Sequence, residues 1–411
     1  MLIRFIIICF ILLFVEFYAF QAFKTLLKVK WTLVLYQVFS ILIFVYIVYS
    51  LSKFDRSLGQ TRDNMNTMGL LLLVFAPKIL LTFVMFGEDI FRLCAGAINY
   101  FVEYDNRDNF LADRRKFVSQ IGMGLAAVPF LSLLYGMTIG KYNFRVIKQS
   151  LYFEDLPTAF DGFKITQISD IHSGSFDNPE KINYAIDLIN QQKSDMILFT
   201  GDIVNSKASE MLPWIDSFNR IEKHKFGHFS VLGNHDYGEY LQWDSAEAKS
   251  ENFQQIKDLH HKIGFDLMLN QHQFVHKDND KIAIVGVENW GHNFKKAGDI
   301  NKASINLKKE DFKILMSHDP SHWEKEVKHH DKFFQLTLSG HTHGMQFGIE
   351  IPGIIKWSLA QYMYKQWAGL YQHKGRYIYV NRGFGFHAYP GRVGIMPEIT
   401  VIDLKKGKSV V

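Results

Sequence analysis

The chain has 411 residues, enough for two or three domains, and it carries 46 lysines and arginines against 41 acidic residues. The cation excess lies in residues 1–150, which hold 16 basic and 9 acidic residues, so the remainder has a net charge of −2. This charge balance argues against nucleic acid as a partner and favours a membrane surface. The chain has only two cysteines, Cys9 and Cys94, which excludes a disulfide framework or a thiolate metal site.

Four apolar runs in the first part of the chain have the length of membrane spans. They lie at residues 5–23, 32–51, 68–86 and 117–139. Each has the roughly 20 residues that cross a hydrocarbon core about 30 Å thick. We therefore expect residues 1–140 to form a transmembrane domain of four helices in a lipid bilayer. A cleaved signal peptide is disfavoured because no small-residue cleavage site follows the first run.

Basic residues beside these runs predict the orientation of the chain. The positive-inside rule places on the cytoplasmic side the group with more cations, which comprises Lys24, Lys28, Lys30, Arg107, Arg114, Arg115 and Lys116. The sequence at 114–117 is similar to a twin-arginine export signal and also suits an ordinary basic anchor, and both interpretations give the same orientation. We expect a multi-pass protein of the cell (inner) membrane whose C-terminal domain lies on the non-cytoplasmic side.

Two charged residues interrupt the apolar runs. Glu16 and Lys78 fall near the middle of the first and third runs. An unpaired charge at that depth is costly, so the pattern predicts an ion pair between them. The alternative is that one or both face a polar cavity or reach towards the membrane surface without pairing.

Residues 141–160 are predicted to be a juxtamembrane linker, after which strand and helix signals alternate. Strands are indicated at residues 163–168, 196–199 and 229–232. Asn178-Pro179-Glu180 has the pattern of a helix start, and a second helical pattern covers residues 212–221. Alternating strands and helices favour parallel sheets whose loops gather at the carboxyl ends of the strands.

The pattern changes after residue 245 but continues to favour sheets. A helix is indicated at residues 246–263, two apolar runs flank a turn at 277–280, and a hairpin is expected near the C terminus. Further strands and apolar runs lie at residues 265–269, 282–287, 313–316, 334–338, 369–371, 377–380 and 399–402. We expect residues 161–411 to form an α/β domain, a two-sheet β-sandwich flanked by helices.

Five short polar motifs fall in a fixed order in this domain, most of them directly after a strand signal. They are Asp170-Ile171-His172, Gly201-Asp202, Gly233-Asn234-His235-Asp236, Ser317-His318 and Gly340-His341-Thr342-His343. Carboxylate, amide and imidazole ligands suit divalent ions such as Mn, Zn or Fe. Two such ions about 3.5 to 4 Å apart, bridged by a carboxylate, hold a hydroxide between them near neutral pH. The motifs together predict a two-metal hydrolytic site.

The motifs and their order resemble those of the calcineurin-like metallophosphoesterase superfamily. The layout is similar to its membrane-anchored subgroup, which includes the transmembrane protein with metallophosphoesterase domain and related bacterial phosphoesterases, and that likeness extends through Asn381-Arg382-Gly383-Phe384-Gly385 and Met396-Pro397-Glu398-Ile399. The resemblance implies that Asp170, His172 and His343 hold one metal ion. It further implies that Asn234, His318 and His341 hold the other and that Asp202 bridges them. It also implies that His235 stands beside the leaving group as a general acid or as a hydrogen-bond donor to a phosphate oxygen, with Asp236 orienting its ring.

Two departures from the subgroup pattern are present, and neither removes a ligand. Met345 replaces the second glycine after the last motif, which predicts a more crowded backbone near the phosphate, and His318 is followed by Asp319-Pro320 where Asn-Pro is commoner.

His387 and Arg392 could reach the substrate phosphate, or could belong to a plain turn-rich loop. The aromatic stretch of Trp357, Tyr362, Tyr364 and Trp367 fits a bilayer interface or a packed helix equally well.

The resemblance implies a metal-dependent phosphoesterase anchored to a membrane. Its substrate is expected to be a phosphodiester, phosphomonoester or pyrophosphate on a lipid or cell-envelope molecule, because four spans exceed what a soluble substrate requires. Lipid-linked sugar pyrophosphates are one candidate, although relatives that act on them work at the cytoplasmic face. A nuclease is disfavoured by the net charge of the soluble domain. A catalytically silent scaffold is disfavoured because every ligand position is intact.

Overall fold

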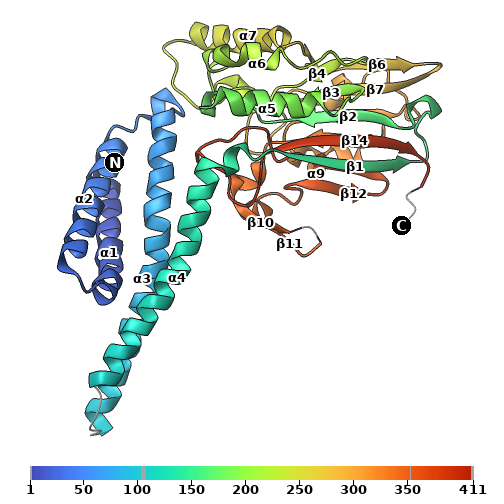
Figure 1. The fold of residues 1–411 in the computed structure, drawn as a ribbon. Coiled ribbons are helices and arrows are strands. Elements are labelled where there is room, and N and C mark those ends of the chain that lie inside the picture. The colour runs from blue at the N-terminus through green and yellow to red at the C-terminus, as the bar shows by residue number, and fades with distance from the viewer. Residues whose placement is uncertain (1, 103–107, 352, 409–411) are drawn as a thin grey trace. The chain divides into compact units, whose positions relative to one another are not determined.

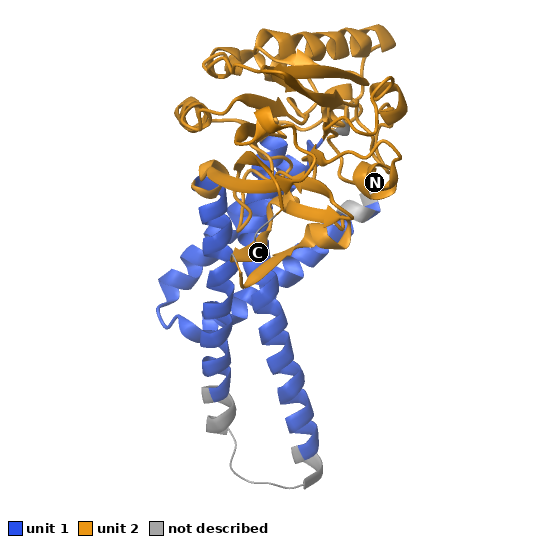
Figure 2. Ribbon diagram, turned by 90° about the vertical axis from the view of Figure 1, so that its right-hand side faces the viewer, with its two compact units in different colours: residues 1–54, 63–138 blue, residues 55–62, 139–411 orange. Residues whose placement is uncertain are grey.

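A computed structural model of the protein describes residues 2–102, 108–351 and 353–408. The chain divides into two compact units (Figure 2). One comprises residues 1–54 and 63–138, and the other comprises residues 55–62 and 139–411. The second unit therefore includes the short segment that joins two membrane helices. Arg107, counted among the cytoplasmic cations, lies outside the described residues.

The first unit is built from four long helices: α1 (Leu2–Leu26), α2 (Lys30–Ser52), α3 (Arg62–Val102) and α4 (Asp108–Thr138). Each contains a stretch long and apolar enough to cross a membrane, which confirms the four predicted spans. The helix α3 is much longer than its apolar run, because the polar residues on both sides continue the helix.

The expected intramembrane ion pair is present within this unit. Lys78 Nζ lies 2.6 Å from Glu16 Oε2 and also donates a hydrogen bond of 2.9 Å to Ser40 Oγ. The hydroxyl of Tyr36 donates to the second oxygen of Glu16 at 2.9 Å. Each charge thus has a charged and a neutral polar partner, which lowers the cost of placing it among apolar helices.

The second unit contains the predicted two-sheet sandwich (Figure 1). The first sheet has the order β1-β14-β2-β3-β4-β5 and the second has the order β12-β13-β9-β8-β7-β6. The strands of the first sheet are β1 (Arg145–Phe153), β14 (Glu398–Lys406), β2 (Phe163–Ile168), β3 (Met196–Phe199), β4 (His228–Ser230) and β5 (Asp266–Leu267). Those of the second are β12 (Gly369–His373), β13 (Arg376–Val380), β9 (Leu336–Ser339), β8 (Lys313–Met316), β7 (Asp280–Gly286) and β6 (Gln271–Lys277).

Apolar side chains fill the space between the sheets and under the outer helices. Ile165 and Leu198 of the first sheet belong to one fully buried cluster with Ile284 and Leu338 of the second. The helices α5 (Pro179–Asn190), α6 (Ile215–Phe218) and α7 (Ala246–Lys262) cover the outer face of the first sheet (Figure 1). The short helices α8 (Ile300–Ala303) and α9 (Ser321–Lys325) pack on the other side of the second sheet. A separate two-stranded sheet, β10 (Gly348–Ile351) with β11 (Ile355–Ser358), leads into a 3-10 helix at Leu359–Tyr362.

Three elements differ from the expectation. Residues 145–153, expected within a linker, form the edge strand β1, which pairs in parallel with β14; its partly exposed, polar sequence hid the strand period. The partner of β7 is β6 and not the run at 265–269, which contributes β5 to the first sheet; β6 is mostly polar, so no apolar run revealed it. The helical pattern at 212–221 is broken into a 3-10 turn and the single turn of α6, with Pro213 near its start.

Candidate metal centre

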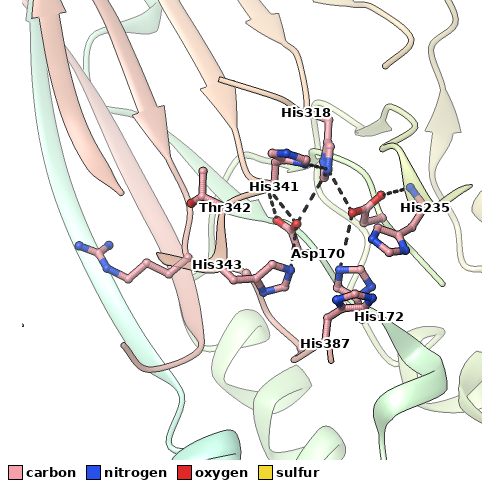
Figure 3. Close-up of polar contacts among 12 residues, drawn as sticks. Asp170, His172, His235, His318, His341, Thr342, His343 and His387 are labelled. Atoms are coloured by element: carbon pink, nitrogen blue, oxygen red, sulfur yellow. Dashed lines mark hydrogen bonds and ion pairs between the residues drawn. The ribbon is translucent and has the colours of Figure 1, made fainter. Parts of the chain in front are cut away.

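The five motifs meet at the carboxyl ends of parallel strands. β2, β3 and β4 run parallel in the first sheet, and β8 and β9 run parallel in the second. Asp170 follows β2, Asp202 follows β3, and Asn234 follows β4. His318 follows β8 and His341 follows β9, so strand ends from both sheets contribute to one site (Figure 3).

The two aspartates each anchor a group of imidazoles. Asp170, His172 and His343 have ligand atoms within 4.8 Å of one another, and so do Asp170, Asp202 and His318. A third group of the same size contains His172, Asp202 and His235. Both carboxylates are almost completely buried. Buried carboxylates grouped with imidazole nitrogens form a donor set that fits divalent ions.

Asp170 is held from two directions. Its carboxylate accepts the backbone N–H of His341 at 2.9 and 3.0 Å, and its Oδ1 lies 3.3 Å from His343 Nε2. Among the described residues, that buried Nε2 atom makes no hydrogen bond. An imidazole nitrogen that is buried without a hydrogen bond and faces a carboxylate is suitably placed for a shared metal ion.

Asp202 occupies the centre of the arrangement. Its Oδ2 lies 3.1 Å from His318 Nε2 and 3.6 Å from His172 Nε2, while its Oδ1 accepts the backbone N–H of His235 at 2.8 Å. Figure 3 shows the ring of His318 pointing into the cluster, where its Nε2 is also 4.0 Å from Asp170 Oδ1. Asp202 therefore contacts residues of both expected ligand sets.

The remaining expected ligands also converge. Asn234 Oδ1 lies 2.7 Å from His341 Nδ1, and that nitrogen is 3.3 Å from His318 Nε2. The opposite nitrogen of His341 meets the hydroxyl of Tyr364 at 2.8 Å. All seven residues that the resemblance implies as ligands thus lie in one cluster.

Five of these seven residues have a left-handed backbone. The φ angles are 51° at Asp170, 48° at His172, 61° at Asp202, 73° at His341 and 48° at His343. Non-glycine residues rarely adopt this region, and such strain concentrates at functional sites because it aims side chains that a relaxed backbone would not.

The glycines of two motifs make room for the carboxylates. A Cβ atom at Gly233 would lie 2.1 Å from Asp202 Oδ1, and one at Gly340 would lie 2.1 Å from Asp170 Oδ2. Such contacts are closer than any side chain can tolerate, so the glycines are required by close approach to the ligands.

The ring of His235 is oriented differently from the expectation. Its Nδ1 donates to the backbone carbonyl of Asn205 at 2.7 Å, so Nε2 is the nitrogen left for a ligand or substrate. Asp236 does not contact the ring: its carboxylate accepts the backbone N–H groups of Gly233, Asp202 and Ile203 at 2.8 to 2.9 Å. The acid thus fixes the backbone that carries two of the expected ligands, Asp202 and Asn234, and does not orient the imidazole.

Asn205 and Glu210 are site residues that the sequence did not reveal. Besides its carbonyl contact with His235, Asn205 places its side-chain oxygen 3.1 Å from His172 Nδ1. The carboxylate of Glu210 accepts the N–H of Asn205 at 2.6 Å and those of Ser206 and Lys207. One residue therefore sets two histidine rings, and a partly buried acid holds that residue in place.

Burial and neighbouring charges shift several pKa values. Burial alone would lower the pKa of His318, but the adjacent negative charge of Asp202 outweighs it and raises that pKa to about 10. Burial, reinforced by nearby imidazoles, lowers the pKa of His172 well below its usual range. Burial also lowers the pKa of His235, against the attraction of Asp202. The pKa of Asp236 is raised to about 7 by burial and by Asp202.

The two substrate-binding candidates of the C-terminal loop occupy different places. The ring of His387 lies beside the cluster, with its centroid 4.8 Å from that of His172 and 4.4 Å from that of His235 (Figure 3). Arg392 is completely buried, where its guanidinium donates to the carbonyls of Arg382, Gly383 and Gly385 and contacts His343 Nδ1 at 3.0 Å. The structure therefore brings His387 to the cluster and places Arg392 against the expected ligand His343.

The aromatic stretch near the C terminus is divided between surface and site. Trp357 and Tyr362 are exposed, whereas Trp367 is buried and Tyr364 contacts His341. Tyr364 also borders a cleft of about 580 Å³ that is lined by Asp319 and by Lys325, Lys328 and Lys365. Because Asp319 Oδ2 lies 3.6 Å from His341 Nε2, this cleft adjoins the cluster.

Both parts of the chain match known families. Residues 163–345 match the family described as calcineurin-like phosphoesterase, and residues 3–141 match the one described as probable calcineurin-like phosphoesterase, transmembrane domain. The uncharacterized metallophosphoesterase YkuE of Bacillus subtilis (strain 168) is 34% identical over 64% of this chain and 84% of its own length. The transmembrane protein with metallophosphoesterase domain of Danio rerio is 27% identical over 66% of this chain and 60% of its own length.

A further relative and a solved structure extend the comparison. An uncharacterized metallophosphoesterase of Helicobacter pylori (strain J99) is 28% identical over 79% of this chain and 80% of its own length. The crystal structure of a 5'-nucleotidase precursor from Thermus thermophilus covers 59% of this chain and 54% of that one, with 11% identity and a TM-score of 0.36.

Proposed function

We propose that this chain, a membrane protein that belongs to the calcineurin-like phosphoesterases and hydrolyses phosphoric esters, works with two divalent ions on a lipid or cell-envelope phosphate. The observation that carries this proposal is the convergence of all seven expected ligands around Asp170 and Asp202. Asp170, His172 and His343 would hold one ion, and Asn234, His318 and His341 the other, with Asp202 between them.

The bound ions, of which Mn, Zn and Fe all suit these ligands, would supply a hydroxide near neutral pH and stabilise charge on the phosphoryl oxygens. The chain would contribute position and proton control. His235 Nδ1 is committed to the carbonyl of Asn205, so its Nε2–H, when the ring is protonated, is the donor available to a phosphate oxygen or leaving group. An anionic substrate would raise the pKa of His235, which burial lowers, and so favour the protonated ring.

The surroundings of the cluster favour an anionic substrate with bulk beyond the phosphate. The cleft beside His341 is lined by Lys325, Lys328 and Lys365 and by two acids, Asp319 and Glu324, so three cations face two anions; Glu324 pairs with Lys328 and Lys365. The ring of His387 lies beside that of His235. Cations in a recess attract phosphorylated molecules. The four membrane spans favour a substrate that resides in or beside a bilayer.

The orientation rests on the basic residues of the membrane unit. Lys24, Lys28 and Lys30 lie at the end of α1 and the start of α2, and Arg114, Arg115 and Lys116 belong to the start of α4. Placing both groups in the cytoplasm puts the phosphoesterase domain on the non-cytoplasmic side of the cell membrane. Protease treatment of intact cells tests this, because only a non-cytoplasmic domain would be cleaved without permeabilisation.

The decisive experiment is metal-dependent hydrolysis by the purified full-length protein in detergent. The protein is loaded with Mn²⁺, Zn²⁺ or Fe²⁺ and supplied with a diester, a monoester and a lipid pyrophosphate. We expect turnover of at least one of them, loss of it in Asp202→Asn and His235→Ala, and full activity in the exposed control His276→Ala. Absence of metal-dependent turnover, or equal turnover in all variants, would favour a silent scaffold instead.

A further inference from the structure

The segment around the two-stranded sheet β10–β11 carries an unusual number of exposed apolar side chains. Ile354 at its turn is 81% exposed, and Tyr362 and Met363, just beyond the second strand, are 74% and 64% exposed. We call this set the apolar hairpin surface; its members are Ile349, Ile351, Ile354, Ile355, Trp357, Leu359, Tyr362 and Met363.

This surface differs from ordinary exposure of single apolar residues. In the rest of the described phosphoesterase domain, exposed large apolar residues such as Tyr184, Leu212 and Ile305 lie far apart in the sequence. Isolated exposed side chains need no explanation, whereas a contiguous apolar patch marks a surface that is covered in use. The hairpin surface is therefore expected to have an occupant.

Aromatic contacts connect this surface to the point where the chain leaves the membrane helices. Tyr142, shortly after the end of α4, packs edge-to-face on Phe386 with ring centroids 5.9 Å apart. In the same loop, Tyr389 packs on Phe347 at 4.7 Å, directly before β10. Two ring contacts and one short loop thus separate the exit of the last membrane helix from the base of the hairpin.

The other side of the surface is continuous with the active-site cleft. Met363 belongs to the hairpin surface and also lines the cleft of about 580 Å³. The next residue, Tyr364, lines the same cleft and contacts His341 at 2.8 Å. A molecule held against the hairpin would therefore lie next to the metal cluster.

We propose that the apolar hairpin surface inserts into the interface of the bilayer that holds the protein's own four helices. A bilayer suits this surface because isoleucine and leucine side chains partition into acyl chains, while tryptophan and tyrosine favour the headgroup level. The bilayer is also always available to this domain, because the four membrane helices of the same chain keep it attached. The insertion is independent of catalysis, and it would present a lipid headgroup to the cleft.

The test uses full-length protein with Cys9→Ser and Cys94→Ser, so that single cysteines can be labelled. A fluorescent label is placed at Ile354→Cys, at Tyr362→Cys and at the control Ile305→Cys, whose native residue is 61% exposed elsewhere in the domain. Each protein is reconstituted into nanodiscs with and without lipids that carry a nitroxide quencher. Water-soluble iodide reports access from solvent.

We expect quenching by the lipid nitroxide at positions 354 and 362 to exceed that at position 305 by at least about twofold. Quenching by iodide should be weaker at 354 and 362 than at 305. Both results are expected for side chains that lie about 5 to 10 Å deep in a membrane interface. Iodide access at 354 equal to that at 305 would overturn the proposal. Protection from iodide without lipid quenching would also overturn it, because a second copy or another protein would then be the occupant.

A functional comparison separates this inference from the proposed enzymatic function. Ile354→Asp would reduce hydrolysis of a bilayer-embedded phosphate ester severalfold and leave a water-soluble ester unaffected, with Ile305→Asp as the matched control. Equal hydrolysis of the embedded ester by both variants would count against the docking role. Failure of the wild type on every ester would challenge the enzymatic proposal and leave the quenching result intact.

Discussion

The carbonyl oxygen of Asn205 accepts the Nδ1–H of His235 at 2.7 Å, and this contact fixes which nitrogen of the expected general acid faces the cluster of expected metal ligands. The side chain of the same Asn205 reaches His172 Nδ1 at 3.1 Å. Asn205 is thus a positioning residue for one expected ligand and for the expected proton donor, through two different atoms.

The two contacts of Asn205 can be separated by mutation. Asn205→Ala removes the side-chain contact with His172 and retains the carbonyl that orients His235. We expect metal affinity to fall about 10- to 100-fold, as for other residues that orient a metal-bound histidine. Metal titration followed by elemental analysis measures this, and the exposed Asn219→Ala serves as control. Unchanged affinity would mean that His172 keeps its orientation without Asn205.

A methyl group at Gly233 should disrupt the bridging carboxylate. The Cβ atom of Gly233→Ala would lie 2.1 Å from Asp202 Oδ1, so the carboxylate or the backbone must move. We expect metal content and phosphoesterase turnover to fall at least about tenfold, since small displacements of catalytic groups have effects of this size. Gly124→Ala, whose Cβ would meet nothing within 4 Å, should behave as wild type. Retention of both metals in Gly233→Ala would contradict the assignment of Asp202 as the bridge.

Glu210 should make stability depend on pH. Burial raises its pKa from the ordinary 4.5 to about 7, against hydrogen bonds from three backbone N–H groups. The folded protein therefore keeps a proton that the unfolded chain releases between these values, and this group's contribution to stability falls as pH rises through that window.

Glu210→Gln should remove that dependence. As the pH rises from about 4.5 to 7, the free energy of unfolding of the variant should increase, relative to that of wild type, by on the order of 1 to 3 kcal/mol. Thermal unfolding of both proteins in detergent at several pH values provides the comparison, with the exposed Glu251→Gln as control. Parallel pH profiles for Glu210→Gln and wild type would show that Glu210 does not titrate in this range.

The ion pair of the membrane unit predicts a compensating pair of substitutions. Lys78→Leu leaves Glu16 without its charged partner and should destabilise the helix bundle by on the order of 3 kcal/mol. Glu16→Gln in the same chain removes the orphaned charge and should restore much of the loss. Detergent-solubilised thermal unfolding of both single variants and the double variant measures the coupling. A double variant no more stable than Lys78→Leu alone would argue against the pair.

The convergence of the expected ligands could be predicted from the sequence because each lies in a short motif after a strand, so local order determines where the side chain falls. Asp170, Asp202 and His341 all meet this condition. The orienting contacts could not be predicted. Asn205 lies only three residues after Asp202, but its contacts with His172 and His235, like that of Tyr364 with His341, form only through tertiary packing. The strand β1 was missed for a related reason: as an edge strand with polar residues, it lacks the apolar period that revealed the central strands.

The segment of residues 55–62 belongs to the phosphoesterase unit although it connects α2 to α3. Gln242 N–H donates to the carbonyl of Ser57 at 3.0 Å, and the guanidinium of Arg62 donates to the carbonyl of Phe176. The chain therefore leaves this unit at α3 and must return to the same face of the membrane at the end of α4. Only an even number of crossings allows this, so the two helices must either both cross the bilayer or both fail to cross it.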